Sequence, residues 1–267
     1  MKLAAIDYHL RTTDARLCAQ AHGLGISALE LSRPSFQGDR CWLSSADGIS
    51  RWHQTTLAMG VSLESFSATF AYEWPLIDRK GRVDLTSVDA LSDLVHSAAF
   101  LKIPLLHVPL LEAAAPKNPG DLRRFHQYLL PALEIAKQYH IQVSLETNWA
   151  ADLSLSLAEM DKTLSISFDP GNCIAVGRNP LHELITLEHR LGQIRLRDRR
   201  RHEIFRSLPL GHGDVNWSEL QQQLLKMSRR PQFVLAATGE AALLEAYASA
   251  GRLLYQLINE PLFHKVA

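Results

Sequence analysis

Short β-rich runs alternate with longer amphipathic segments along the whole chain, and this alternation restricts the fold more than any other feature. The predicted strands are Leu3–Tyr8, Ala28–Ser32, Val61–Ser67, Leu105–Leu110, Gln142–Thr147, Leu164–Asp169, Gln193–Asp198 and Phe233–Thr238. Helices are predicted between them, at Thr13–His22, Asp47–Met59, Leu85–Leu101, Leu122–His140 and Ser218–Met227. Strict alternation predicts a parallel sheet covered by helices. Eight strands favour a single (β/α)8 TIM barrel over an open doubly wound sheet.

Length and loop pattern agree with one barrel domain that spans residues 1–267. A chain of 267 residues suits a single barrel, and 46% hydrophobic residues provide a large core. The longest predicted loops, Ala68–Asp84 and Arg199–Asn216, follow strands, which predicts a working face at the carboxyl ends of the strands. No glycine-rich phosphate fingerprint follows the first predicted strand, which argues further against a Rossmann fold. No organic cofactor is expected.

Composition points to a cytoplasmic protein that works on small molecules. The 28 basic residues balance the 28 acidic ones, so the chain has no overall attraction to nucleic acid or to a membrane surface. Its apolar runs are too short to span a bilayer, and Asp7 interrupts the apolar stretch that a signal peptide would need. Three widely spaced cysteines fit neither a disulfide framework nor a zinc site made of cysteines.

Polar residues at the ends of three consecutive predicted strands are the strongest functional signal. The sequence Val143–Asn148 is an apolar strand that ends in Glu146, and Ile166–Asn172 is a strand that ends in Asp169 before a Pro-Gly turn. The next strand continues into Ile194–Arg199, and the segment Pro209–Trp217 follows it. The carboxyl ends of barrel strands meet at one mouth, so these side chains are expected to lie together.

The order and spacing of these segments resemble a family of sugar-phosphate isomerases, ketose 3-epimerases and inosose dehydratases, the xylose-isomerase-like barrels. That family's pattern runs Glu-x-Asn, Phe-Asp-x-Gly-Asn/His, Val-His-x-Lys-Asp, Gly-x-Gly-x-Val-Asp-Trp and a final strand-end Glu. The resemblance implies a small sugar or sugar-acid substrate and a divalent ion held by two carboxylates, a histidine and the last glutamate. It implies proton transfer through an enediolate, and assembly as a homo-oligomer of two or four chains.

This chain departs from the family pattern at two of the four ligand positions. Glu146 and Asp169 retain the carboxylates, but Arg195 takes the histidine position and Ala236 the position of the last glutamate. Arginine has no lone pair to offer and stays protonated, so it cannot bind a metal. The hypothesis is that Arg195 lies close to Glu146 and Asp169 in place of the ion, leaving no metal or a weakly held Mg²⁺, Mn²⁺ or Zn²⁺. In the alternative, Arg195 turns outward and His212 or His107 completes a rebuilt site.

The resemblance also assigns roles, each with a structural alternative. Glu146 is expected to act as the base and Arg195 as the cation that stabilises an enediolate. The residues expected to contact substrate are Glu30, His107, Asn172, Arg197 and His212. Arg197 suits a substrate carboxylate or phosphate, and an ion pair with Asp198 or Asp169 is the alternative. Glu30 is expected to reach either the substrate or an arginine. His107 is equally explained as a satisfied core histidine, and Asn172 by turn chemistry.

Three functions compete at this point. The leading prediction is an isomerase or epimerase of a sugar or sugar acid, with β-elimination as a related chemistry. The second is a non-catalytic relative that binds a carbohydrate or a partner protein. The third is DNA repair, because endonuclease-IV-type enzymes share the barrel and the basic run Arg195–His202 superficially supports it. That chemistry needs a histidine-rich multi-zinc site, which the strand ends here lack, so no nucleic acid partner is expected.

Overall fold

Eight parallel strands close into a barrel in sequential order, with β1 paired to β8. The computed structural model describes residues 2–7, 16–32, 46–78, 82–111, 115, 119–236, 247–252 and 254. The strands are β1 (Leu3–Ile6), β2 (Ala28–Ser32), β3 (Ser62–Ser67), β4 (Leu105–Leu110), β5 (Gln142–Thr147), β6 (Leu164–Phe168), β7 (Leu191–Leu196) and β8 (Gln232–Leu235). The predicted fold class, a (β/α)8 TIM barrel, is confirmed. The predicted strand ends at Tyr8 and Thr238 lie outside the described residues.

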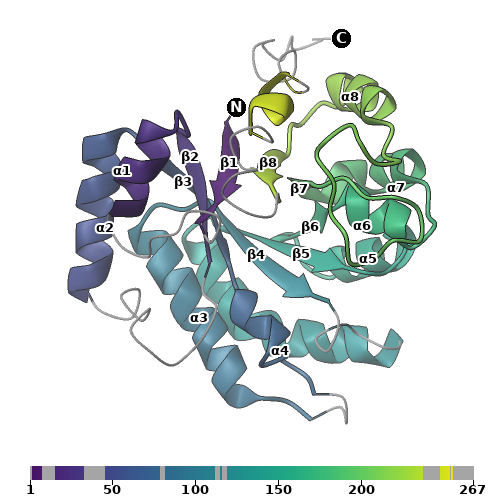
Figure 1. Cartoon of the computed structure of the whole chain (residues 1–267). Helices are drawn as coiled ribbons and strands as arrows, with labels where there is room; N and C mark the ends of the chain where they lie inside the picture. The colour runs from purple at the N-terminus through teal and green to yellow at the C-terminus, as the bar shows by residue number, and fades with distance from the viewer. Residues whose placement is uncertain are drawn as a thin grey trace, which may run out of the picture.

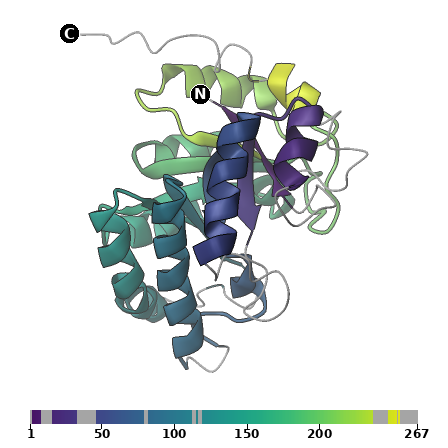
Figure 2. The same cartoon turned by 90° about the vertical axis from the view of Figure 1, so that its left-hand side faces the viewer.

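Helices surround the barrel, with α1 to α4 on one side and α5 to α8 on the other (Figure 1). They are α1 (Arg16–Gly23), α2 (Ala46–Met59), α3 (Leu85–Phe100), α4 (Pro119–Gln138), α5 (Ala151–Ala158), α6 (Pro170–Ala175), α7 (Pro180–Leu187) and α8 (Trp217–Lys226), with the 3₁₀ helices η3 (Thr69–Tyr72) and η5 (Glu188–Arg190). Figure 2 turns the α1–α4 side toward the viewer. Among the helices in the described part of the chain, none is both long and apolar enough to cross a membrane.

Helix ends follow the capping residues that the sequence provides. Asp84 begins α3 by accepting a hydrogen bond from the Thr86 N–H at 3.0 Å. Asn216 begins α8 in the same way, through the Glu219 N–H at 3.3 Å. Gly60 stops α2 with a φ of +64°, a backbone conformation that side chains with a Cβ disfavour. α3 begins at Leu85 and α2 ends at Met59 as predicted, whereas α8 begins at Trp217, one residue before the predicted Ser218.

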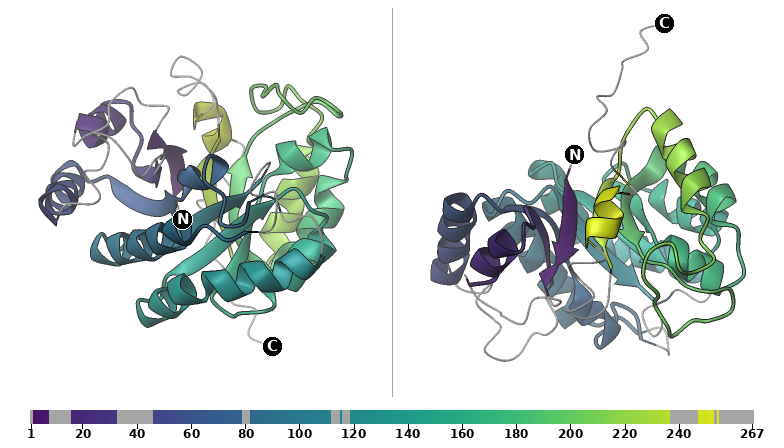
Figure 3. Two further views of the ribbon diagram at one scale, coloured as in Figure 1. Left: turned by 90° about the horizontal axis from the view of Figure 1, so that it is seen from below. Right: turned by 45° about the horizontal axis from the view of Figure 1, so that its top comes forward.

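The barrel separates two kinds of interior, one enclosed by the strands and one between the strands and the helices, which lie outside the strands in Figure 3. Between strands and helices lies a large apolar core. Inside the barrel, one small apolar cluster contains Ala4, Ile6, Ala28, Val234 and Ala236. The rest of the lumen is polar, since residues of strands that are not neighbours bond across it. Gln193 on β7 donates to Glu30 on β2 at 3.2 Å, for example. A polar lumen is unusual for a fold whose interior is mostly branched apolar side chains, and it leads directly to the site.

The long loop after β7 is closed by one buried carboxylate. Asp198 accepts hydrogen bonds from the Gly211 N–H at 2.8 Å, the Trp217 indole at 3.0 Å and the Val215 N–H at 3.3 Å. A Cβ on Gly213 would lie 2.1 Å from an Asp198 oxygen, so only glycine permits this approach. The glycine-rich segment therefore shapes the loop beside the barrel mouth and needs no contact with a substrate to explain it.

Candidate functional site

The guanidinium of Arg195 is the centre of a buried ion-pair network inside the barrel. Its Nη1 donates to both carboxylate oxygens of Glu30, at 2.9 and 3.1 Å, and to Gln193 Oε1 at 3.1 Å. Its Nε lies 3.5 Å from Glu146 Oε2. The side chain of Arg195 is only 6% exposed, and those of Glu30 and Glu146 are 0% and 3% exposed. One fixed cation is thus shared between two buried acids on opposite sides of the lumen.

Glu146 is held by donors on both of its oxygens. Oε2 lies 3.0 Å from His107 Nε2, and Oε1 accepts from Asn172 Nδ2 at 3.0 Å. Burial by itself raises the pKa of Glu146, but the hydrogen bond from His107 and the charge of Arg195 outweigh it and lower that pKa to about 2. Glu146 is therefore an anion at neutral pH.

His107 completes this part of the network as a neutral imidazole. Burial and the positive charge of Arg195 lower the pKa of His107, more than its hydrogen bond to Glu146 raises it. We assign the proton to Nε2, which donates to Glu146, so that Nδ1 accepts from the Ser67 hydroxyl at 2.7 Å. His107 is 1% exposed and its ring is fully engaged by protein groups.

Glu30 on β2 is the second buried anion. Ser65 donates to it at 2.7 Å, in addition to the bonds from Arg195 and Gln193. Burial raises the pKa of Glu30, yet the charge of Arg195 and the hydrogen bonds from Ser65 and Arg195 give a net lowering. The sequence predicts that Glu30 reaches the substrate or an arginine, and in the structure both of its oxygens accept from the single nitrogen Nη1 of Arg195.

Asp169 lies at the end of β6 and has two partners of different kinds. One oxygen accepts from the Asn172 N–H at 2.8 Å and caps α6, while the other lies 3.4 Å from Arg197 Nε. Burial and the nearby charge of Glu146 raise the pKa of Asp169 against the opposing effect of Arg197. The predicted pairing of a guanidinium with both strand-end acids is thus divided, since Arg195 lies against Glu146 and Arg197 against Asp169.

Gly171 lets the turn after Asp169 approach β7. A Cβ at this position would lie 2.6 Å from the carbonyl oxygen of Arg197. Only a movement of the backbone could relieve so short a contact. We expect Gly171→Ala to lower the free energy of unfolding by about 1–3 kcal/mol, measured by urea denaturation. Gly23→Ala is the matched control because nothing lies within 4 Å of a Cβ there, and it should change stability by less than about 1 kcal/mol. Equal effects of the two changes would contradict the close approach.

The part of the site open to the mouth is cationic. The side chain of Arg197 is 18% exposed, whereas that of Asp169 beside it is 2% exposed. Arg199 is half-buried, and after burial the charge of Arg197 is the largest cause that lowers the pKa of Arg199. Two guanidiniums therefore lie close enough to repel each other, above acids that are themselves covered.

One predicted site residue lies outside the network, and several residues that were not predicted belong to it. His212 is exposed on the loop, and within the described residues its side chain bonds to no member of the network. Sequence reasoning missed four residues that the structure brings into the network, namely Ser65, Ser67, Gln193 and Arg199. The sequence could have revealed the two serines and Gln193. They are polar residues at alternate strand positions, which point into the lumen as Glu30 and Arg195 do.

The donor set does not fit the divalent ion that the resemblance implies. Both oxygens of Glu146 and both of Asp169 already lie against donors or guanidiniums. Ala236 is buried at the position of the last glutamate and offers no ligand. Over the described residues, no group of three or more His, Cys, Asp or Glu side chains could hold a metal. A cation would also be repelled by Arg195.

Comparison with known proteins identifies the fold group. A family model described as a xylose isomerase-like TIM barrel matches residues 18–254. No curated protein sequence matches the chain significantly. Among solved structures, a xylose isomerase domain protein from Planctomyces limnophilus has a TM-score of 0.74 at 17% identity, covering 97% of this chain and 98% of its own.

Two further solved structures are similar over almost their whole length. D-psicose 3-epimerase from Clostridium cellulolyticum H10, solved with D-tagatose, has a TM-score of 0.73 at 13% identity and covers 95% of this chain and 99% of its own. A xylose isomerase-like TIM barrel protein from Mycobacterium smegmatis, solved in complex with magnesium, has a TM-score of 0.72 at 14% identity and covers 95% and 96%. At these identities the likeness establishes the fold.

Proposed function

The chain belongs to the xylose isomerase-like TIM barrel family, and on that premise we propose that it is an isomerase or epimerase of a small sugar or sugar acid in which Arg195 replaces the divalent ion. The observation that carries the proposal is the ion-pair network of Arg195 with Glu30 and Glu146. It puts a permanent positive charge in the lumen beside a strand-end carboxylate. The substrate class is supported by the similar fold of D-psicose 3-epimerase, whose structure was solved with D-tagatose.

The chemistry requires a base and a cation close together. Glu146, held as an anion, removes the proton from the carbon next to the substrate carbonyl, and the electron pair moves to the carbonyl oxygen. The guanidiniums of Arg195 and Arg197 stabilise the enediolate oxygen that results. Return of the proton from Glu146 to the same carbon completes the exchange. Its return to the neighbouring carbon, together with transfer of the adjacent hydroxyl's proton to the enediolate oxygen, completes the isomerisation. Ala236 offers no second base from the last strand, so a one-base isomerisation fits this chain better than a two-base epimerisation.

The accessible charge favours a substrate with an acidic group. Arg197 is partly exposed after β7 and Arg199 lies near it with its Nη1 bonded to the Ile204 carbonyl, whereas Glu30 and Glu146 are covered. A guanidinium pairs in a forked geometry with a carboxylate or a phosphate. We therefore expect sugar acids or sugar phosphates to bind more tightly than neutral sugars.

A second candidate, a non-catalytic carbohydrate binder, is favoured by the state of Glu146. A carboxylate with a pKa near 2 is a weak base, and its two oxygens are already bonded to His107 and Asn172. For catalysis, substrate must displace one of these partners. The binder needs no such displacement.

Solvent deuterium exchange separates the two candidates. The protein is incubated in D₂O with keto-sugars, keto-acids and their phosphates, and deuterium at the carbon next to the carbonyl is followed by NMR. We expect exchange with at least one acidic substrate, unchanged after EDTA treatment and reduced at least about 100-fold in Glu146→Gln, because removal of a general base typically costs that much.

The outcomes are distinct for each candidate. A ligand that binds with no exchange at any pH would support the binder and overturn the enzyme. Exchange that disappears with EDTA and returns with Mn²⁺ would overturn replacement of the ion by Arg195. His189→Ala is a matched control because His189 is 60% exposed on η5, outside the network and without a predicted substrate contact, so its exchange rate should equal that of the unmodified chain.

A further inference from the structure

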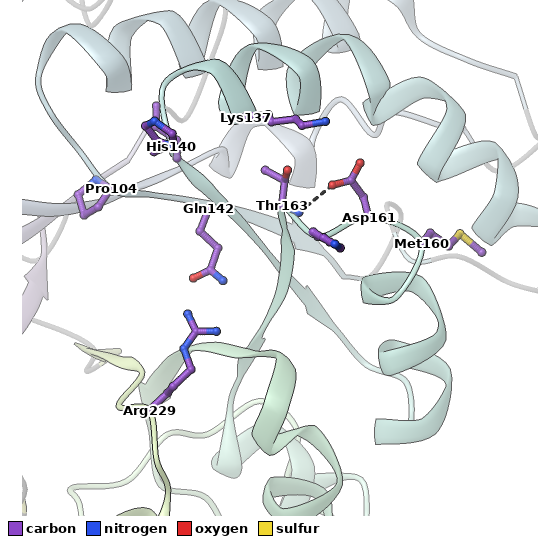
Figure 4. A pocket seen from close by; sticks show the side chains of 10 residues that line it. Pro104, Lys137, His140, Gln142, Met160, Asp161, Thr163 and Arg229 are labelled. Atoms are coloured by element: carbon purple, nitrogen blue, oxygen red, sulfur yellow. Dashed lines mark hydrogen bonds between the residues drawn. The ribbon is translucent and has the colours of Figure 1, made fainter. Parts of the chain in front are cut away.

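An open cavity lies at the opposite end of the barrel from the ion-pair network of Arg195. It has a volume of about 670 Å³, and its lining comes from the segments that lead into β4, β5, β6 and β8. The lining residues are Pro104, Lys137, His140, Ile141, Gln142, Met160, Asp161, Lys162, Thr163 and Arg229 (Figure 4). The volume lies within the range of small-molecule sites, although the amino-terminal end of such barrels usually serves stability.

The lining of this cavity carries excess positive charge. Lys137, Lys162 and Arg229 are exposed around it, and within the part of the chain that the structure describes their side chains form no hydrogen bond or ion pair. Asp161 is the acid of the lining, and one of its oxygens is occupied by the Thr163 N–H at 2.7 Å. Cations gathered without partners repel each other, and a bound anion relieves that repulsion.

Neutral hydrogen-bonding groups lie between the cations. In Figure 4 the amide of Gln142 and the guanidinium of Arg229 point toward each other across the cavity. The hydroxyl-bearing Thr163 lines the same space. A forked guanidinium, two ammonium groups and neutral polar groups together suit an oxyanion with several acceptor oxygens.

We propose that this cavity is a binding site for a small multivalent phosphate anion, held by Arg229, Lys137 and Lys162. The site is separate from the barrel mouth, because its residues belong to the helix-to-strand connections whereas Arg195 and Arg197 belong to the carboxyl end of β7. Its ligand therefore binds without competing with a substrate at the mouth.

Calorimetric titration of the full-length chain with pyrophosphate tests the site, with inorganic phosphate as the comparison. Pyrophosphate should bind more tightly than phosphate, and its binding should weaken as the salt concentration is raised. Arg229→Gln and Lys162→Gln should each raise the Kd about tenfold, which corresponds to about 1.4 kcal/mol. The matched control is Arg123→Gln, at the other end of α4 from Lys137 and roughly 20 Å away.

A second control separates this cavity from the barrel mouth. Arg197→Gln should leave pyrophosphate binding at this site unchanged. No saturable binding of pyrophosphate to the unmodified chain would overturn the proposal. So would binding that survives Arg229→Gln and Lys162→Gln but is lost in Arg197→Gln, since the anion would then occupy the mouth. Neither result depends on whether the mouth catalyses a reaction.

Discussion

Arg195→Met is expected to lower the free energy of unfolding at pH 7 by about 3–5 kcal/mol, because it leaves two buried carboxylates without their shared cation. Glu30 and Glu146 are almost completely covered, so water cannot replace the lost guanidinium. Urea denaturation with matched protein concentrations measures the loss. Arg82→Met is the control, since Arg82 is a 73% exposed arginine paired with Asp78 and should cost at most about 1 kcal/mol.

The pH dependence of this loss gives a sharper test. In the unmodified chain the pKa values of Glu30 and Glu146 are lowered, so their stabilisation is present above the unfolded pKa of about 4.3 and disappears as pH falls toward about 2. In Arg195→Met the buried acids should have raised pKa values, so that variant should lose stability as pH rises. The difference between the two proteins should therefore grow from pH 5 to pH 8. A loss that is independent of pH would show that Arg195 contributes packing alone.

A double variant tests whether the stability lost in Arg195→Met comes from its ion pair with Glu30. Glu30→Gln removes one of the two buried charges and is close to glutamate in shape. In the Arg195→Met background it should recover part of the stability, whereas in the presence of Arg195 it should destabilise the chain. Opposite signs in the two backgrounds would demonstrate coupling between Glu30 and Arg195. Additive effects would contradict the ion pair between Glu30 and Arg195.

The fold could be predicted from the sequence because its signal is periodic and repeated. Each strand is a short apolar run, and β2, β4 and β5 begin and end where the sequence predicts. β7 spans Leu191–Leu196, two residues earlier at both ends than predicted, and β6 and β7 shift register between Ile166 and Ser167. The shift lies beside Gly192, where a Cβ would lie 2.3 Å from the Ser165 hydroxyl, and the apolar pattern of the sequence does not reveal it.

The sequence predicts where the site residues lie better than it predicts which cation pairs with which acid. Strand ends showed that Glu146, Asp169, Arg195 and Arg197 share one mouth, because alternate residues of a strand face the same side. Which cation pairs with which acid depends on reach across the lumen, and local sequence carries no information about that distance. Arg195 extends to Glu30 on β2, a residue 165 positions away in sequence. The sequence predicts an arginine as one possible partner of Glu30, but it does not identify Arg195 as that arginine.

Restoring two side chains should restore divalent metal binding. Arg195→His and Ala236→Glu together return the ligand types that the family pattern places beside Glu146 and Asp169, and imidazole with carboxylates suits Mn²⁺ or Zn²⁺. Glu30→Gln is included to avoid leaving a buried charge without Arg195. We expect the triple variant to bind Mn²⁺ at least about tenfold more tightly than the unmodified chain, equivalent to about 1.4 kcal/mol, as measured by electron paramagnetic resonance.

Matched variants show whether the restored ligands are responsible. The variant with Glu30→Gln and Arg195→His alone lacks the carboxylate at position 236 and should bind Mn²⁺ more weakly than the triple variant. Mn²⁺ should raise the Tm of the triple variant in a concentration-dependent way, because an ion that binds only the folded state stabilises it. If the unmodified chain binds Mn²⁺ as tightly as the triple variant, the ion and Arg195 coexist in the lumen. The guanidinium would then not be a replacement for the metal, and the proposed division of charge among Arg195, Glu30 and Glu146 would be wrong.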